Sequence, residues 1–218
     1  MSVQAVRFRY LVLLIPLGLP LFCAGPAWGQ NIVAQWNFDT GDPNGNGTVR
    51  TGLGYEAQTV DPNAMASDIS IGDNIPDTTE NWIQFCDPPY PTLVLRVPPG
   101  SGSSSPDLAV LQDKYIQFTV TANTGLTLNL SSLTFDAARG GNAVPRGWAL
   151  LSDVDGFTNY IDTQDVPTVR NVLTSFSVDL SDASFQKLTE VTFRIYTYVP
   201  GSGQSIEYDN ITLNGTVQ

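Results

Sequence analysis

The sequence of 218 residues contains no histidine and only two cysteines. Without histidine the chain cannot build a Ser-His-Asp or Cys-His catalytic group, and it cannot bind zinc through histidine ligands. Cys23 lies in an N-terminal apolar segment, so Cys86 is alone in the rest of the chain and no disulfide can form there. We interpret Cys86 as a buried small hydrophobic residue. The fold must then be stabilised by its core, with a bound metal as the other available source.

Basic residues are also scarce. Ten Lys and Arg stand against 21 Asp and Glu, which gives a formal net charge of −11 at pH 7. Such a surface is a poor partner for nucleic acid or anionic membranes, because both are negatively charged. Divalent cations and neutral or polar glycans are compatible with it. A high negative charge also keeps a secreted protein soluble, so the charge by itself does not indicate a ligand.

The N-terminal hydrophobic run Leu11–Cys23 is too short to cross a membrane. A spanning helix needs roughly 18–20 apolar residues, and two prolines interrupt this run. Two arginines precede it, and small residues occupy the positions expected before a cleavage site after Gly29. We predict a signal peptide over residues 1–29 and a secreted, extracellular or cell-surface domain over residues 30–218. A lipoprotein attached through Cys23 is the alternative, although Phe22 stands where a small residue is required.

The remaining chain consists of short apolar runs separated by clusters of Gly, Pro, Asn, Asp and Ser. In YIQFTVTA, residues 115–122, apolar and polar residues alternate, which is typical of a strand with one buried face. The pattern predicts an all-β protein: one antiparallel β-sandwich domain of jelly-roll, galactose-binding-like type. In LTLNLSSLTF the apolar phase shifts at Ser131–Ser132, which predicts a bulge. The predicted strands cover residues 32–38, 66–71, 82–86, 93–97, 115–122, 126–136, 147–152, 172–180, 189–199 and 205–214.

Two of the predicted loops are long. Residues 39–65 and 98–113 are rich in Gly, Pro, Ser and Asn. Loops of this length in a compact domain are either functional or mobile, and the sequence does not distinguish the two. One helical turn is predicted within residues 182–188, and no longer helix is needed.

Five motifs follow one another in the second half of the chain: LSSLTF, a tryptophan strand in RGWALL, DGF, LTEVTFRIY and DNITLNG. In this order they resemble the secreted β-sandwich proteins of environmental bacteria that are associated with PEP-CTERM sorting tails. The resemblance covers roughly residues 64–217 and implies the sandwich fold, export, and association with extracellular polysaccharide or the cell-surface matrix. Members commonly continue into a Pro-Glu-Pro motif, an apolar helix and a basic end, whereas this sequence stops at Gln218. We therefore expect release or non-covalent attachment.

Acidic residues follow the first predicted strand and interrupt the last one. Asp39 and Asp42 come after the first strand, and Asp209 lies within the last, where Asp is an unfavourable residue. The arrangement resembles jelly-roll carbohydrate-binding modules, in which calcium often bridges the neighbouring first and last strands through carboxylate and carbonyl oxygens. We predict a structural calcium site formed by Asp39, Asp42 and Asp209. The alternative is that Asp39 and Asp42 are turn residues and that Asp209 accepts backbone N–H bonds at a bulge.

Alternation within VTFRIYTY places Arg194, Tyr196 and Tyr198 together on the strand face opposite the core. Tyrosine rings beside an arginine are suited to stacking on sugar rings. We add Trp148, from RGWALL, to this surface and predict that these four residues bind a ligand. The alternative places the aromatic residues, the tryptophans above all, in the core.

Two further patterns are weaker. Asp153, Asp155 and Gly156 begin like a calcium-binding EF-hand loop, but position twelve is Gln164 and no flanking helices are predicted, so we favour a turn between strands. No pair of carboxylates stands out for glycoside hydrolysis. The sequence thus predicts a secreted, non-catalytic carbohydrate- or extracellular-matrix-binding protein. The alternatives are a structural cell-surface or biofilm matrix protein without a specific small ligand and, behind it, a glycan-active enzyme.

Overall fold

The computed structural model describes residues 31–38, 48–49, 55–72, 74–75, 83–85, 93–100, 102–140, 145–201 and 204–218. The predicted signal peptide lies outside these residues, as do Asp39, Asp42 and Cys86. What the sequence predicts for them therefore stays a prediction.

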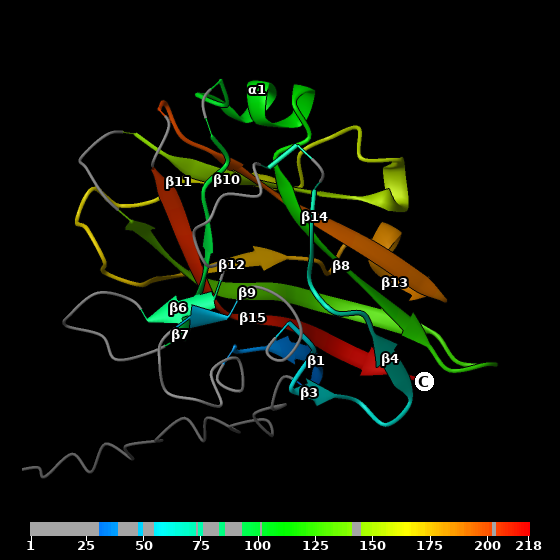
Figure 1. Cartoon of the computed structure of the whole chain (residues 1–218). Helices are drawn as coiled ribbons and strands as arrows, with labels where there is room; N and C mark the ends of the chain where they lie inside the picture. Colours follow the sequence, from blue (N-terminus) through cyan, green and yellow to red (C-terminus); the bar gives the residue numbers. More distant parts are fainter. Residues whose placement is uncertain are drawn as a thin grey trace, which may run out of the picture.

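The described residues form two antiparallel β-sheets (Figure 1). Sheet A has nine strands: β1 (Ile32–Trp36), β2 (Thr48–Val49), β3 (Thr59–Val60), β6 (Ile83–Phe85), β7 (Leu93–Val97), β9 (Leu128–Gly140), β12 (Thr174–Asp179), β13 (Gln186–Leu188) and β15 (Ser205–Val217). Sheet B has six strands: β4 (Ala64–Ala66), β5 (Ser70–Ile71), β8 (Tyr115–Ala122), β10 (Gly147–Ser152), β11 (Asp162–Asp165) and β14 (Glu190–Tyr198). Three short helices connect strands: α1 (Pro106–Leu111) and the 3₁₀ turns η1 (Asp153–Asp155) and η2 (Ala183–Phe185).

From β7 onward the chain crosses repeatedly between the two sheets, so sequential strands pack face to face more often than they pair side by side. Sheet A has the order β12-β9-β15-β7-β6-β2, with β1 also paired to β15, and sheet B has the order β11-β10-β14-β8-β4. This crossing pattern, with the first and last strands adjacent, is that of a jelly-roll sandwich. The predicted fold class is confirmed.

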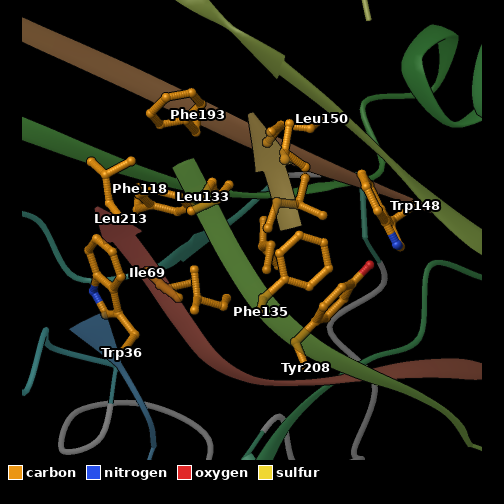
Figure 2. Close-up of a cluster of buried hydrophobic side chains, with 14 of the residues drawn as sticks. Trp36, Ile69, Phe118, Leu133, Phe135, Trp148, Leu150, Phe193, Tyr208 and Leu213 are labelled. Carbon is orange, nitrogen blue, oxygen red and sulfur yellow. The ribbon is translucent and has the colours of Figure 1, made fainter. Parts of the chain in front are cut away.

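The core fills the space between the sheets, and its largest side chains come from both (Figure 2). The rings of Trp36 and Phe118 lie 4.6 Å apart, and those of Phe135 and Trp148 lie 4.9 Å apart. Tyr208 OH and Thr197 Oγ1, from opposite sheets, lie 2.8 Å apart and form a polar bridge across the core. Each fully buried large apolar side chain stabilises the fold by about 1.5–3 kcal/mol, so this shared core of aromatic and aliphatic residues stabilises the packing of the two sheets.

Sequence alternation predicted the core faces of the long strands correctly. In β8 the residues Ile116, Phe118 and Val120 are fully buried, while the residues between them are partly exposed. The small strands β2, β3 and β4 and helix α1 lie in or at the end of the regions predicted as long loops, whereas β5 lies within the predicted strand 66–71. The predicted helical turn in residues 182–188 is found as η2. Within the described residues, the helices are too short to cross a membrane.

The predicted bulge is present in β9. The register between β9 and β15 jumps from Ser132–Asn214 to Leu130–Gly215, which leaves Ser131 as the extra residue. A side chain at Gly215 would bring its Cβ within 2.3 Å of the Asn129 carbonyl oxygen, so the close approach of the strands requires glycine there.

Strand β15 changes partner midway along one of its edges. Ile206 to Tyr208 pair with β7, whereas the residues from Ile211 onward pair with β1, and β9 lies along the other edge throughout. Between these segments the register shifts and Asn210 adopts a left-handed conformation with φ 50°. Asp209 thus lies where the last strand passes from β7 to β1.

Candidate functional site on the outer face of sheet B

Strands β10, β14 and β8 are neighbours in sheet B (Figure 1). Every second side chain of each strand lies on the face turned away from the core. Their register forms rows across this outer face, and one such row is Leu151, Arg194 and Gln117. The residues buried on this face form what we call the covered half: Gly147, Ala149, Leu151, Tyr196 and Tyr198. Tyr115 is partly exposed at the boundary, and the other partly or largely exposed residues form the open half: Gln117, Thr119, Thr121, Glu190, Thr192 and Arg194.

Helix α1 lies over the covered half. Its N-cap is Ser105, whose Oγ accepts a hydrogen bond from Leu108 N at 3.3 Å, and Pro106 occupies the first turn, where its missing N–H has no consequence. Ala109 is the buried residue of the helix and packs in one cluster with the covered half. A helix of six residues is not stable alone, so this contact with the sheet stabilises it.

Tyr196 and Tyr198 point to the outer face, as alternation predicted, but they are only 2% and 7% exposed. Tyr198 OH donates to Asp165 Oδ1 at 2.7 Å and lies 3.2 Å from Gln164 O. Burial raises the pKa of both phenols. The prediction of an exposed tyrosine stripe is therefore wrong, because α1 and the residues around it cover the rings.

Trp148 also lies away from the surface. It is fully buried and faces the core, with its ring 4.9 Å from Phe135 and 5.3 Å from Phe176, both edge to face. The prediction that Trp148 extends a binding surface is wrong. Trp36 is likewise fully buried, so the alternative core placement is confirmed for both.

Arg194 is the one member of the predicted binding set that stays partly exposed. Its guanidinium carbon lies 4.2 Å from the centroid of the Tyr115 ring and 4.0 Å from that of Phe157. Arg194 Nε donates to Gln117 Oε1 at 2.8 Å, and its NH1 lies 3.4 Å from Tyr196 OH. Cation–π contacts of this kind contribute about 0.5–2 kcal/mol each. The Tyr115–Arg194–Phe157 stack is thus held at the boundary between the two halves.

Phe157 is placed by the turn around η1, in the segment DVDGFTNY. The residue has φ 57°, and its N–H donates to Ser152 O at 2.8 Å. Asp155 Oδ2 accepts from the side chain and the backbone N–H of Asn159, at 2.8 and 2.9 Å, and the side-chain bond is the main cause that lowers the pKa of Asp155. Asp153 Oδ1 accepts from Thr192 N at 2.9 Å. The interpretation of this segment as a turn between strands is confirmed.

The open half is lined by short polar side chains. The hydroxyl oxygens of Thr119 and Thr192 lie 2.9 Å apart, and Thr121 Oγ1 donates to Glu190 Oε2 at 2.7 Å. At the end of the sheet this surface leads into a groove of about 780 Å³. The groove is lined by Met65, Thr121, Ala122, Asn123, Thr124, Gly125, Leu126, Thr189 and Glu190.

Asp209, from the predicted calcium site, is buried in β15. Its Oδ1 accepts from Asn210 N at 2.7 Å, and Asn210 Nδ2 donates to Asp136 Oδ2 at 3.0 Å. This supports the alternative reading in which Asp209 accepts backbone N–H bonds at a bulge. The adjacency of β1 and β15 agrees with the resemblance that motivated calcium, but Asp39 and Asp42 lie outside the described residues. Among the residues that are described, no three Asp, Glu or Cys side chains group as metal ligands.

A second polar cluster, which sequence reasoning missed, lies where β9 and β15 meet at one end of sheet A. Arg146 NH1 donates to the carbonyl oxygens of Gly140 and Ser205, which lie opposite each other, with a distance of 2.7 Å to Ser205. Burial lowers the pKa of Arg146 to about 10; nearby Arg139 lowers it too, and Glu207 acts in the opposite direction. The guanidinium is fully buried and satisfies main-chain acceptors, so we assign it a structural role.

Sequence reasoning identified Arg194 but missed both rings that hold it. Tyr115 opens the strand YIQFTVTA with the parity of the outer face, so alternation could have placed it on this face. Its position beside Arg194 depends on the register of β8 with β14. The signal for Phe157 is weaker. Gly156 adopts a left-handed conformation with φ 71°, and only the fold shows that the following residue returns over β14.

The fold and this surface together define a class: an antiparallel jelly-roll β-sandwich with one partly open sheet face. The sequence matches no family model and no curated protein. Among solved structures it is similar to the K3 cleaved adhesin domain of Lys-gingipain from Porphyromonas gingivalis, with 12% identity, 85% of this chain and 99% of that chain covered, and a TM-score of 0.40.

Two further similar structures have comparable scores. The CBM22-1 xylan-binding domain of Xyn10C from Paenibacillus barcinonensis has 8% identity, covers 85% of this chain and 95% of its own, and has a TM-score of 0.43. The Stig cyclase Fisc from Fischerella sp. has 12% identity, with 85% and 98% covered, and a TM-score of 0.44. These scores describe a distant similarity in strand arrangement and carry no functional argument.

Proposed function

We propose that this protein is a secreted, non-catalytic carbohydrate- or matrix-binding β-sandwich whose ligand binds on the open half of sheet B. The observation that carries the proposal is the Tyr115–Arg194–Phe157 stack. Both rings are partly exposed, and they hold a cationic donor in a fixed orientation at the surface. Rings for the apolar face of a sugar and donors for its hydroxyl groups are the two things a glycan site needs.

The hydrogen-bonding capacity of the stack supports a polar ligand. A guanidinium has five N–H donors, and within the described residues Gln117 and Tyr196 each engage one of those of Arg194. The described partners include no carboxylate, so the other donors are directed to solvent or a ligand. Gln117 and the threonine hydroxyls nearby both donate and accept, which matches the groups of a sugar.

The proposal is tested by a polysaccharide binding screen, using affinity electrophoresis followed by calorimetry. We expect binding to at least one polysaccharide, weakened about tenfold or more by Phe157→Ala and by Arg194→Gln, which corresponds to ~1.4 kcal/mol or more. Lys187→Gln and Val169→Ala are matched controls, since they remove an exposed cation and an exposed apolar side chain elsewhere. The proposal fails if no polysaccharide binds. Self-association without any such binding would favour the structural matrix protein.

Calcium remains a proposal of its own: a structural ion held by Asp209 together with Asp39 and Asp42. A ligand that binds only the folded state raises the unfolding free energy, by about 2.7 kcal/mol at a concentration one hundred times its Kd. We expect a higher Tm in millimolar calcium than in EDTA, and no such difference in Asp39→Asn. Equal melting temperatures of the unsubstituted protein in the two buffers would exclude this site.

A further inference from the structure

We infer that the ligand of the open half is an uncharged, extended polysaccharide chain that runs along β14 and β8, from the Tyr115–Arg194–Phe157 stack to the groove beside Glu190. This inference rests on the proposed function and adds the length, direction and charge of the ligand. It joins two features that lie at opposite ends of the same polar surface.

The strand register gives the direction and length of this path. On the outer face the row of Arg194 and Gln117 is followed by Thr192 with Thr119, and then by Glu190 with Thr121. Strands rise about 3.3 Å per residue, so the four steps along the strand from Arg194 to Glu190 span roughly 13 Å. One sugar ring cannot reach both ends, whereas an extended chain that lies along the strands can.

The charges along the path select an uncharged chain. Arg194 at one end disfavours a polycation, and Glu190 at the other disfavours a polyanion. The rows between them carry threonine hydroxyls, which donate and accept hydrogen bonds without charge. The net charge of −11 also repels polyanions at long range.

The groove offers a second contact of the kind found at the stack. Met65 is 59% exposed at its wall, and Leu126 also lines it, while Thr121, Asn123 and Glu190 supply polar groups. An apolar side chain beside hydrogen-bonding groups is complementary to a sugar ring, which has an apolar face and polar edges. Sheet B continues from β8 to β4, which carries Met65, so the path and the groove lie on adjoining strands (Figure 1).

The test measures how binding depends on chain length. Calorimetry with cello-oligosaccharides and manno-oligosaccharides, each from dimer to hexamer, is compared with polygalacturonate and chitosan as charged polymers. We expect one neutral series to bind about tenfold more tightly as the hexamer than as the dimer. Phe157→Ala should weaken both lengths, whereas Met65→Ser should weaken only the hexamer, about fivefold.

Val169→Ser is the matched control for Met65→Ser, because both side chains are 59% exposed and Val169 lies outside the open half and the groove. Equal affinity for dimer and hexamer, or an equal effect of Met65→Ser on both, would overturn the extended path and leave the proposed function standing. Binding of polygalacturonate or chitosan alone, lost in Phe157→Ala, would overturn the uncharged ligand only. Failure of every neutral and charged probe to bind would count against the proposed function itself.

Discussion

The covered and open halves of the outer face of sheet B are built from the same strands with the same alternation, yet they differ in burial and in chemistry. Tyr196 is 2% exposed beneath α1, whereas Arg194, two residues earlier on β14, stays partly exposed. A six-residue helix accounts for much of this difference, because it converts one end of a polar face into a small apolar layer. Alternation along a strand therefore determines on which face of the sheet a side chain lies, while the segments packed above that face determine how exposed the side chain is.

The largest change in unfolding free energy is expected for Tyr196→Ala, in the covered half. The ring packs with Ala149, Leu151 and Ala109, so its removal leaves a cavity and should lower the unfolding free energy by about 3–5 kcal/mol. Thr119→Ala, in the open half, removes one hydroxyl hydrogen bond to Thr192 and should lower it by only about 0.5–1 kcal/mol. Urea unfolding followed by tryptophan fluorescence measures both. Similar losses for the two variants would mean that the halves are not energetically distinct.

A smaller loss of unfolding free energy is expected from Gly147→Ala, which adds one methyl group within the covered half. The new Cβ would lie 2.2 Å from both Gln164 O and Tyr198 OH, so the backbone or the ring must shift. Overpacking of this kind costs about 1–3 kcal/mol. Gly201→Ala is the control, since its Cβ would meet Gln204 at an ordinary 3.7 Å. Thermal unfolding by circular dichroism should separate the two, and equal melting temperatures would contradict the tight packing described here.

Tyr198→Phe tests the contribution of the Tyr198 hydroxyl group to the stability of the covered half. It keeps the ring and removes the hydroxyl that donates to Asp165 Oδ1 at 2.7 Å, which should cost about 1–2 kcal/mol because the acceptor is a carboxylate. A double-mutant cycle with Asp165→Asn measures the coupling between the two groups. Additive losses in this cycle would show that the hydrogen bond does not link β11 to β14 across β10.

The smallest expected effect is a dependence of Tm on pH in the alkaline range. Burial, followed by the hydrogen bond to Asp107, raises the pKa of Tyr160 to about 12, so the folded state favours the neutral phenol. The stabilisation is complete below the ordinary pKa of about 10 and is lost as the pH rises toward 12. Tyr160→Phe should flatten the fall in Tm between pH 10 and 12. An unchanged profile in this variant would show that the Asp107 contact on α1 does not act on stability.

Parts of this fold could be predicted because they depend on local pattern. The alternation in β8 placed Phe118 in the core, and the phase shift at Ser131 located a bulge that the register confirms. The crossing of the chain between sheets and the adjacency of β1 and β15 followed from the fold class. For the core faces and the bulge the information lies within a few neighbouring residues, because the period of a strand is two.

The candidate site could be predicted only in part, because its members come from segments far apart in the chain. Arg194 was identified, but Phe157 reaches it from the turn after β10, and Tyr196 is buried by a helix within a segment predicted as a loop. The environment of Asp209 could likewise be predicted only in part. Its position in β15 was visible as an unfavourable strand residue, yet its place at the change of partner from β7 to β1 depends on three strands at once.

The sequence by itself determined the class of fold, the core faces of the long strands, and the exclusion of histidine chemistry, since these depend on composition and on a period of two residues. Only the tertiary structure decided which outer-face residues reach solvent. It buries Tyr196, Tyr198 and Trp148, which were predicted beside Arg194, and places the rings of Tyr115 and Phe157 against Arg194 instead. The physical reason is that burial arises from contacts between segments distant in sequence, and no local period records those contacts.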